Sequence, residues 1–221
     1  MQKNNFCLLS IVSSDNLPCN LESIIYSLPF GKSEAERLKK IKNPIAQKNS
    51  LASLLCLCSI LASLGIDPKH DDLTIDRKAG GKPYFSSCPL HFNITHSENI
   101  CAVAVSDKNI GIDLEFTNTS RDISAISKRF FSSHEHSAIC KDSDPYSLFF
   151  SLWTKKEAMA KLSGKGLADI SSDQITERSD LFFKNYRLID GQLVAFLSIC
   201  SENKNINIAI DNSTDLLVSE L

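Results

Sequence analysis

The segment GIDLEF, residues 111–116, has the pattern of a strand in which apolar and acidic residues alternate. Successive side chains of a strand point to opposite faces, so the carboxylates of Asp113 and Glu115 share one face. The same alternation is also typical of any half-exposed strand. A turn at residues 107–109 precedes the segment, and the chain divides there into two halves, residues 1–108 and 109–221.

Both halves show one order of elements, in which a strand precedes helices and further strands follow. Before the turn we predict a strand at 6–12, a basic helix with a Ser33–Glu36 capping box, a helix at 45–64, a loop at 80–83, and a segment 92–97 leading into a strand at 100–106. After it we predict helices near 121–129 and 133–140, a long helix from Pro145 to Gly164 capped by Asp144, a hairpin of 181–189 with 192–200, and a strand at 206–210. The sequence therefore predicts an α+β fold.

The composition excludes several classes of protein. The formal net charge of −2 gives no general attraction to nucleic acid or to an anionic membrane. The apolar stretch at 51–64 is interrupted by serines and is short for a membrane span, so we expect a core helix. No secretory signal is recognisable, and the eight cysteines are scattered, which favours free thiols in a cytoplasmic protein.

A second acidic position lies in WTKKEAMAKLSGKG, residues 153–166. Helical spacing puts Trp153, Glu157 and Lys161 on one stripe that ends at Gly164. A carboxylate between lysines can bind a metal ion while the ammonium groups hold phosphate oxygens, although Glu157 and Lys161 can also form an ordinary surface pair. Oxygen ligands joined by a substrate phosphate suit Mg²⁺, so we predict a metal site that handles a phosphate ester.

The segment FNITHS, residues 92–97, adds a histidine flanked by hydroxyl groups and an amide. Such a group can donate several hydrogen bonds to phosphate oxygens. The alternative is a histidine that caps the entrance of a strand. The basic residues around 37–48 and Lys82 in the GGKP loop are mostly explained as a solvated surface, and one or two can meet a nucleotide phosphate.

Five segments in order, GGKPYF (80–85), FNITHS (92–97), GIDLEF (111–116), KRFFSSHE (128–135) and WTKKEAMAKLSGKGL (153–167), together resemble the 4′-phosphopantetheinyl transferases of the surfactin-synthetase-activating (Sfp) type. The resemblance implies a pseudo-dimer of two similar α+β halves with the active site in the cleft between them. It implies transfer of phosphopantetheine from coenzyme A to a serine of an apo acyl or peptidyl carrier protein, releasing 3′,5′-ADP.

The resemblance also implies the site residues. Asp113, Glu115 and Glu157 match the positions that hold Mg²⁺, with Mn²⁺ as an alternative ion. Glu157, Lys161 and His96 match the catalytic positions. The implied coenzyme A contacts are Arg37, Lys48, Ser50, Lys82, Pro83, Thr95, His96, Lys156 and Lys161.

Two positions depart from the family pattern. Thr95 replaces the usual serine before the histidine, which retains the hydroxyl but adds a methyl group. Asn49 stands where a phosphate-binding arginine or lysine is expected, so the contact to the 3′-phosphate depends on Lys48 or is lost.

The implied mechanism needs a base for the carrier serine, and Glu157 or a water that it orients is the candidate. Lys161 and His96 add positive charge where negative charge develops. We expect a monomer. The rival functions are a non-catalytic coenzyme A-binding module and a metal-dependent nucleotide phosphatase. The carrier stays open among fatty-acid, polyketide and non-ribosomal peptide systems.

Overall fold

A computed structural model describes residues 5–18, 20–71, 73–164 and 179–221 of the 221-residue chain. It contains two compact units: Met1–Ile110 with Asn205–Thr214, and Gly111–Lys204 with Asp215–Leu221. The predicted division into the halves 1–108 and 109–221 of the transferase fold stays a prediction. The return of Asn205–Thr214 to the first unit was not predicted, because it depends on a strand pairing with residues about 200 positions earlier.

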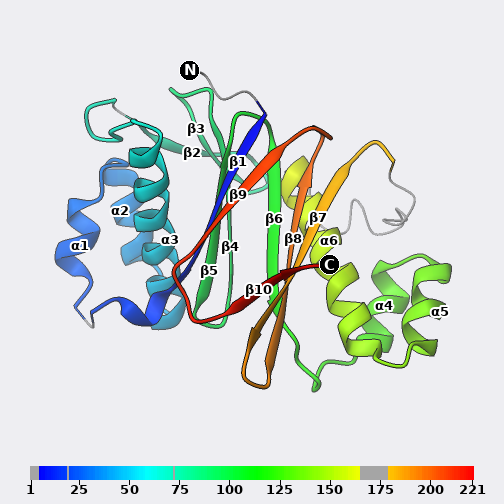
Figure 1. Cartoon of the computed structure of the whole chain (residues 1–221). Helices are drawn as coiled ribbons and strands as arrows, with labels where there is room; N and C mark the ends of the chain where they lie inside the picture. Colours follow the sequence, from blue (N-terminus) through cyan, green and yellow to red (C-terminus); the bar gives the residue numbers. More distant parts are fainter. Residues whose placement is uncertain (1–4, 19, 72, 165–178) are drawn as a thin grey trace. The chain divides into compact units, whose positions relative to one another are not determined.

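The first unit is built on a four-stranded sheet with the order β4-β5-β1-β9 (Figure 1). Its strands are β1 (Phe6–Ser13), β4 (His91–Ser97), β5 (Ile100–Ser106) and β9 (Asn207–Asn212). β1 is antiparallel to β5 and parallel to β9. The helices are η1 (Ser14–Asn16), α1 (Glu22–Ser27), α2 (Lys32–Lys39) and α3 (Pro44–Ser63). Two short strands, β2 (Ile75–Arg77) and β3 (Pro83–Phe85), form a hairpin around the GGKP loop and were not predicted.

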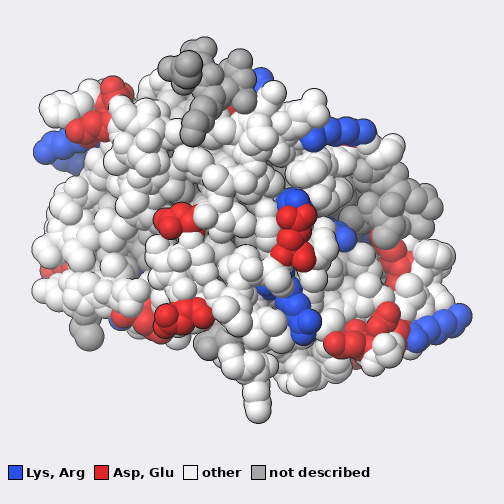
Figure 2. All heavy atoms as spheres, in the orientation of Figure 1, with Lys and Arg blue, Asp and Glu red and all other residues white. Residues whose placement is uncertain are grey.

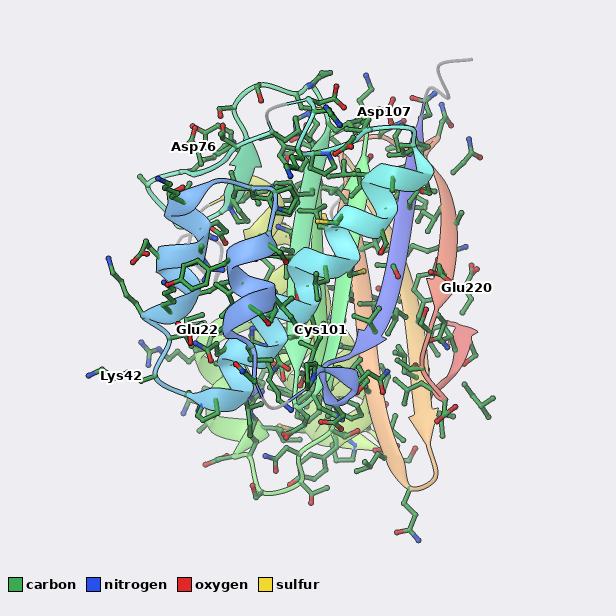
Figure 3. All side chains as sticks on the ribbon, turned by 90° about the vertical axis from the view of Figure 1, so that its left-hand side faces the viewer. Glu22, Lys42, Asp76, Cys101, Asp107 and Glu220 are labelled. Carbon is green, nitrogen blue, oxygen red and sulfur yellow. The ribbon has the colours of Figure 1, made fainter. Side chains whose placement is uncertain are left out.

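The helix α3, which the sequence predicts as a core helix, contributes Leu51, Leu54, Cys56, Leu57, Ile60 and Leu61 to the buried core of the first unit. Asn43 caps it by accepting a hydrogen bond from the Ala46 amide at 3.0 Å, and Pro44 occupies the first turn. The helix packs on β1 and β5 (Figure 3). The two strands are also joined at one end, where Asp107, directly after β5, accepts hydrogen bonds from the Asn5 and Phe6 amides. By length and composition α3 could also cross a membrane, but half of its apolar window is buried inside the protein.

The predicted capping box of α2 is wrong. The helix begins at Lys32, one residue before Ser33, and its N-cap is Gly31, which makes no side-chain capping bond. A complete capping box occurs instead at the start of α5 (Ser133–Lys141), where Ser132 and Glu135 bond to each other's backbone amides.

The second unit contains another four-stranded sheet, with the order β10-β7-β8-β6. Its elements are β6 (Ile110–Phe116), α4 (Ile123–Phe130), α5 (Ser133–Lys141), α6 (Pro145–Ser163), β7 (Phe182–Asp190), β8 (Leu193–Ser201) and β10 (Leu217–Glu220). α6 packs on β8. The predicted cap is confirmed, since Asp144 accepts from the Ser147 amide at 3.1 Å, and Gly164 ends the helix with φ of +72°.

The sheets of the two units share the order of three of their strands. In the first, one strand, three α-helices and then β4 and β5 form the sheet order β4-β5-β1. In the second, the described elements β6, α4, α5, α6, β7 and β8 follow one another, and the strands have the order β7-β8-β6. This mixed α and β organisation agrees with the predicted fold class.

Candidate functional site

The site of the second unit begins with a close approach of β6 to α6. A Cβ atom on Gly111 would lie 2.0 Å from the Ala158 carbonyl oxygen and 2.4 Å from the Leu162 nitrogen. Only glycine permits this contact, because the atoms in the way belong to the backbone of the helix. No role was predicted for this glycine, although a glycine inside a strand pattern is the usual signal of a close approach.

The close approach joins the two acidic segments predicted from the sequence. Lys161 Nζ on α6 lies 2.7 Å from Asp113 Oδ1 on β6. Asp113 is 4% exposed, and β6 is buried on both faces from Gly111 to Leu114, so the half-exposed strand is wrong for this carboxylate. Glu115 is half-buried, and its carboxylate lies 3.8 Å from the guanidinium of Arg121.

Glu157 is electrostatically part of the same group. The pKa of Glu157 is raised from 4.5 to about 7. The largest cause is burial, the next is the nearby carboxylate of Asp113, and Glu115 adds to the shift. Lys161 and Arg121 act in the opposite direction. Lys161 therefore interacts with two acidic residues, and a simple surface pair with Glu157 does not describe it.

The fit of this group to a metal ion rests on the chemistry of the donors. Among the described residues, no three His, Cys, Asp or Glu side chains stand close enough to form a ready-made metal site. Asp113 and Glu115 nevertheless raise the cost of ionising Glu157, and a hard divalent cation would relieve that repulsion. Asp113, Glu115 and Glu157 thus fit Mg²⁺ by donor type and by charge.

Lys156, next to Glu157, lies inside the second unit. Its side chain is 0% exposed, and its ammonium group donates a hydrogen bond to the Phe130 carbonyl at the end of α4. The ammonium also lies 5.0 Å from the centre of the Phe131 ring. In this arrangement Lys156 ties α6 to α4, and its predicted contact with coenzyme A stays a prediction. Gly166 and Leu167 of the same motif lie outside the described residues.

The first unit carries the predicted phosphate contacts of the FNITHS segment on β4. Thr95 is buried and His96 is exposed. The start of α3 reaches the same end of β4, because the side-chain amide of Asn49 donates to the Glu98 carbonyl at 2.7 Å. Lys48 Nζ lies 3.4 Å from the Leu17 carbonyl, and Ser50 is half-buried.

Arg37 belongs to an ionic cluster around the buried carboxylate of Glu34 that the sequence did not indicate. Glu34 is 3% exposed and accepts hydrogen bonds from Arg37 Nε at 2.7 Å and Arg77 Nη2 at 2.9 Å. Arg77 also bonds the Gly81 carbonyl at 3.4 Å, which ties the cluster to the GGKP loop. Glu34 and Arg77 are 43 residues apart, so no local pattern could reveal the bond between them.

The loop lysine is also held in place. Lys82 Nζ bonds the Asn109 side chain at 2.8 Å and the Ile110 carbonyl at 3.0 Å. Pro83 begins β3 beside it. These bonds connect the GGKP loop to the start of β6.

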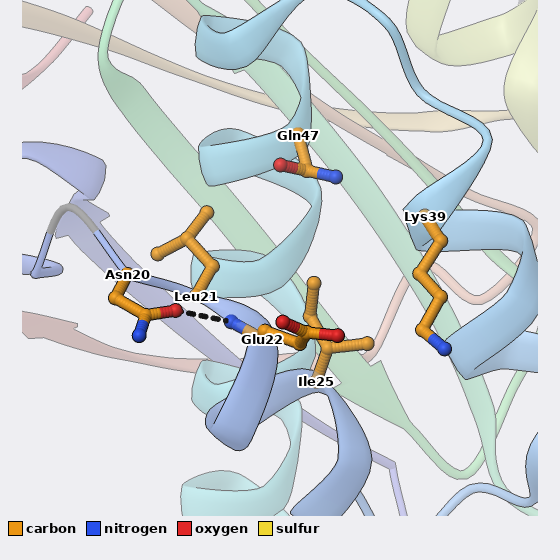
Figure 4. Close-up of a pocket in the computed structure, with 6 residues that line it drawn as sticks. All are labelled: Asn20, Leu21, Glu22, Ile25, Lys39 and Gln47. Carbon is orange, nitrogen blue, oxygen red and sulfur yellow. Dashed lines mark hydrogen bonds between the residues drawn. The ribbon is translucent and has the colours of Figure 1, made fainter.

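A pocket of about 320 Å³ lies in the first unit between α1, the end of α2 and the start of α3 (Figure 4). It is lined by Asn20, Leu21, Glu22, Ile25, Lys39 and Gln47, of which Lys39 belongs to the basic residues around 37–48 considered for a nucleotide phosphate. On the face drawn in Figure 2, acidic and basic side chains of the described residues are interspersed, in keeping with the small net charge.

Comparison with known proteins places the chain among characterised relatives. The model of the 4′-phosphopantetheinyl transferase superfamily matches residues 109–211. The chain is 33% identical over 150 residues to the 4′-phosphopantetheinyl transferase HetI of a Nostoc species, covering 64% of this chain and 62% of that protein. It is 31% identical over 169 residues to a 4′-phosphopantetheinyl transferase of Bacillus subtilis, covering 75% and 73%.

A shorter match has higher identity. The chain is 41% identical over 101 residues to the 4′-phosphopantetheinyl transferase Sfp of Bacillus subtilis strain 168, covering 44% of each protein. The aligned part thus spans less than two thirds of the Nostoc relative and of Sfp.

Proposed function

Because the chain belongs to the 4′-phosphopantetheinyl transferase family, we propose that it transfers phosphopantetheine from coenzyme A to a serine of an apo acyl or peptidyl carrier protein, releasing 3′,5′-ADP. The observation that carries this proposal is the group formed by Asp113, Glu157 and Lys161. It lies within the segment that the family model matches, and it combines carboxylates with an ammonium group, as phosphate transfer requires.

The proposed metal is Mg²⁺, held by Asp113, Glu115 and Glu157. When bound, it would supply positive charge to the pyrophosphate and so make 3′,5′-ADP a better leaving group. The raised pKa of Glu157 supports this assignment, since it marks a position where added positive charge is favourable.

In this proposal the protein's own side chains bind the phosphate groups of coenzyme A and accept the proton of the carrier serine. Lys161 is placed to hold phosphate oxygens, and His96 is proposed to contact a phosphate of coenzyme A from the first unit. Glu157, or a water that it orients, is proposed to accept the proton of the carrier serine. The use of both units by one substrate, across a cleft between two similar halves, is part of the proposal.

The test is to incubate the protein with coenzyme A, Mg²⁺ and a panel of apo carrier proteins and to measure the product masses. We expect at least one carrier to gain the mass of phosphopantetheine, and we expect EDTA to prevent this gain. If no carrier gains the mass while another family member modifies the panel, the proposal is wrong.

The variant Glu157→Gln tests the acidic group. We expect it to abolish transfer and to weaken coenzyme A binding to a still measurable level, because the amide neither binds Mg²⁺ well nor accepts the serine proton. Glu36→Gln, an exposed change on α2, is the control and should transfer at the wild-type rate. A wild-type rate in Glu157→Gln would remove this residue from the site.

The same assay separates the rival functions. A coenzyme A-binding module would bind its ligand without turnover, and a nucleotide phosphatase would release phosphate with no carrier present. The proposal includes a cytoplasmic monomer, and light scattering of the purified protein tests the oligomeric state.

A further inference from the structure

The turn between β4 and β5 has a strained backbone. Glu98 has φ of +52°, a left-handed conformation that residues other than glycine rarely adopt. Ser97 pairs with Ile100, so Glu98 and Asn99 form a two-residue hairpin loop. Positive φ at the first position of such loops normally belongs to Gly, Asn or Asp. A glutamate there keeps this conformation only if the surroundings hold it.

Asn49 on α3 holds the first half of this turn. Its Nδ2 atom donates to the Glu98 carbonyl at 2.7 Å, and the residue is only 2% exposed. The backbone of Asn49 is itself fixed, since Ser53 Oγ at 2.8 Å and Cys101 Sγ at 3.5 Å donate to its carbonyl. Cys101, labelled on β5 in Figure 3, is the strand partner of His96.

A separate set of bonds holds the second half of the turn. The Ser14 amide donates to the Asn99 carbonyl at 2.8 Å. The Asn99 side chain donates to Asp15 and, at 3.5 Å, to Ser13 Oγ. The turn is thus attached to α3 at Glu98 and to the region of η1 at Asn99.

Two features of Asn49 and Glu98 lower the folding stability. Asn49 Oδ1 is buried and has no hydrogen-bond partner among the described residues, and a half-satisfied buried amide is unfavourable. The positive φ of Glu98 adds backbone strain. Unfavourable features of this kind gather at functional sites, and this one directly follows His96 and Ser97.

We propose that Asn49 is a positioning residue, whose amide holds the strained turn at Glu98 and thereby fixes His96 at the end of β4. The inference rests on the proposed function, because His96 matters here as a contact for a phosphate of coenzyme A. Asn49 does not replace the phosphate-binding arginine or lysine expected at its position. Its donor is committed to the backbone of the turn, so it acts through His96.

The first test is Asn49→Leu, which keeps the side-chain volume and removes both the donor and the unpaired acceptor. We expect the KM and the calorimetric Kd for coenzyme A to rise about tenfold, the size of one lost hydrogen bond. The kcat at saturating coenzyme A should stay within about twofold of wild type, because the group around Glu157 is intact. The double variant with Glu98→Gly should recover most of the affinity, since glycine adopts positive φ without help.

The matched control is Asn43→Ala, which removes another asparagine bond from the same helix, the cap to the Ala46 amide. It should lower the melting temperature and leave the affinity for coenzyme A unchanged. If Asn49→Leu binds coenzyme A like wild type, or if Glu98→Gly does not restore binding, Asn49 is only structural and the inference is wrong.

Hydrogen exchange tests the clamp without turnover. The amides of Asn99 and Ile100 should exchange at least about tenfold faster in Asn49→Leu than in wild type or Asn43→Ala. Equal exchange in all three proteins would overturn the inference. If the wild type modifies no carrier, the proposed function fails by itself, while the exchange and the coenzyme A titration still decide the role of Asn49.

Discussion

At the scale of single residues, Glu157 has a strongly perturbed pKa. Burial and the carboxylate of Asp113 raise its pKa to about 7, while its ordinary value is 4.5. The folded protein therefore holds a proton that the unfolded chain releases between these two values. Folding stability must fall as the pH rises through this window. Above about pH 7 the buried carboxylate is ionised, and the loss of folding stability that it causes is complete.

The fall of folding stability with rising pH leads to a prediction for Glu157→Gln in the presence of EDTA. At pH 8 we expect the variant to be more stable than wild type by about 1 kcal/mol, after allowing for the partial exposure of the side chain. That corresponds to a rise in melting temperature of about 2–4 °C. At pH 5 the two proteins should melt within about 1 °C of each other, because wild-type Glu157 is then mostly protonated.

Melting curves at both pH values, with and without Mg²⁺, make the comparison. Glu36→Gln, on the exposed face of α2, should show no such pH dependence. A wild type as stable as Glu157→Gln at pH 8 would contradict the raised pKa. Added Mg²⁺ should stabilise the wild type and leave the variant nearly unchanged.

At the scale of elements, the contact between β6 and α6 decides the geometry of the acidic group. The strand carries Asp113 and the helix carries Lys161, and the absence of a side chain at Gly111 lets them meet. The obstacles to a larger residue are backbone atoms, which cannot move aside as a flexible side chain can.

We predict that Gly111→Ala forces β6 away from α6 and lowers stability by about 2–4 kcal/mol, as overpacking of a rigid core does. Transfer activity should fall further than the folded fraction does, because Asp113 and Lys161 separate. Chemical denaturation measures the first effect and the mass assay the second. Gly191→Ala is the control: its Cβ meets nothing within 4 Å, so any loss reflects only the positive φ of 56° in the hairpin. Equal, small losses in both variants would show that β6 and α6 are not closely packed at Gly111.

At the scale of the whole molecule, the chain returns to its first unit after completing most of the second. β9 pairs with β1 in register from Phe6 and Asn207 to Ile11 and Asn212. β10 then pairs with β7 in the other sheet. The last seventeen residues of the sequence therefore contribute to both units.

Two truncations separate these contributions. Removal of residues 215–221 deletes β10 alone, and we expect faster hydrogen exchange in β7 with β1 unchanged. Removal of residues 205–221 deletes β9 as well, and we expect exchange in β1 to become at least about tenfold faster, because β1 becomes an edge strand. Unchanged exchange in β1 after the longer truncation would contradict the assignment of β9 to the first unit.

The sequence by itself determined the features that depend on neighbouring residues. The helical periods of α3 and α6, the cap of α6 by Asp144, and the alternation along β6 each involve residues within about four positions of one another. The motifs that resemble the transferase family are equally local. For that reason α3, α6 and β6 were predicted from the sequence, and the roles of the acidic residues stay predictions. The capping box of α2 failed because the helix begins at Lys32, before Ser33.

The tertiary structure alone decided burial and long-range partners. Lys161 meets Asp113 across 48 residues, and Glu34 binds Arg77 across 43. No pattern showed that Lys156 is buried against the end of α4 or that Asn49 holds the turn at Glu98. Such contacts depend on how strands and helices pack. Burial sets the desolvation free energy of each charge or amide, and the partner packed against it decides whether a hydrogen bond or ion pair offsets that free energy.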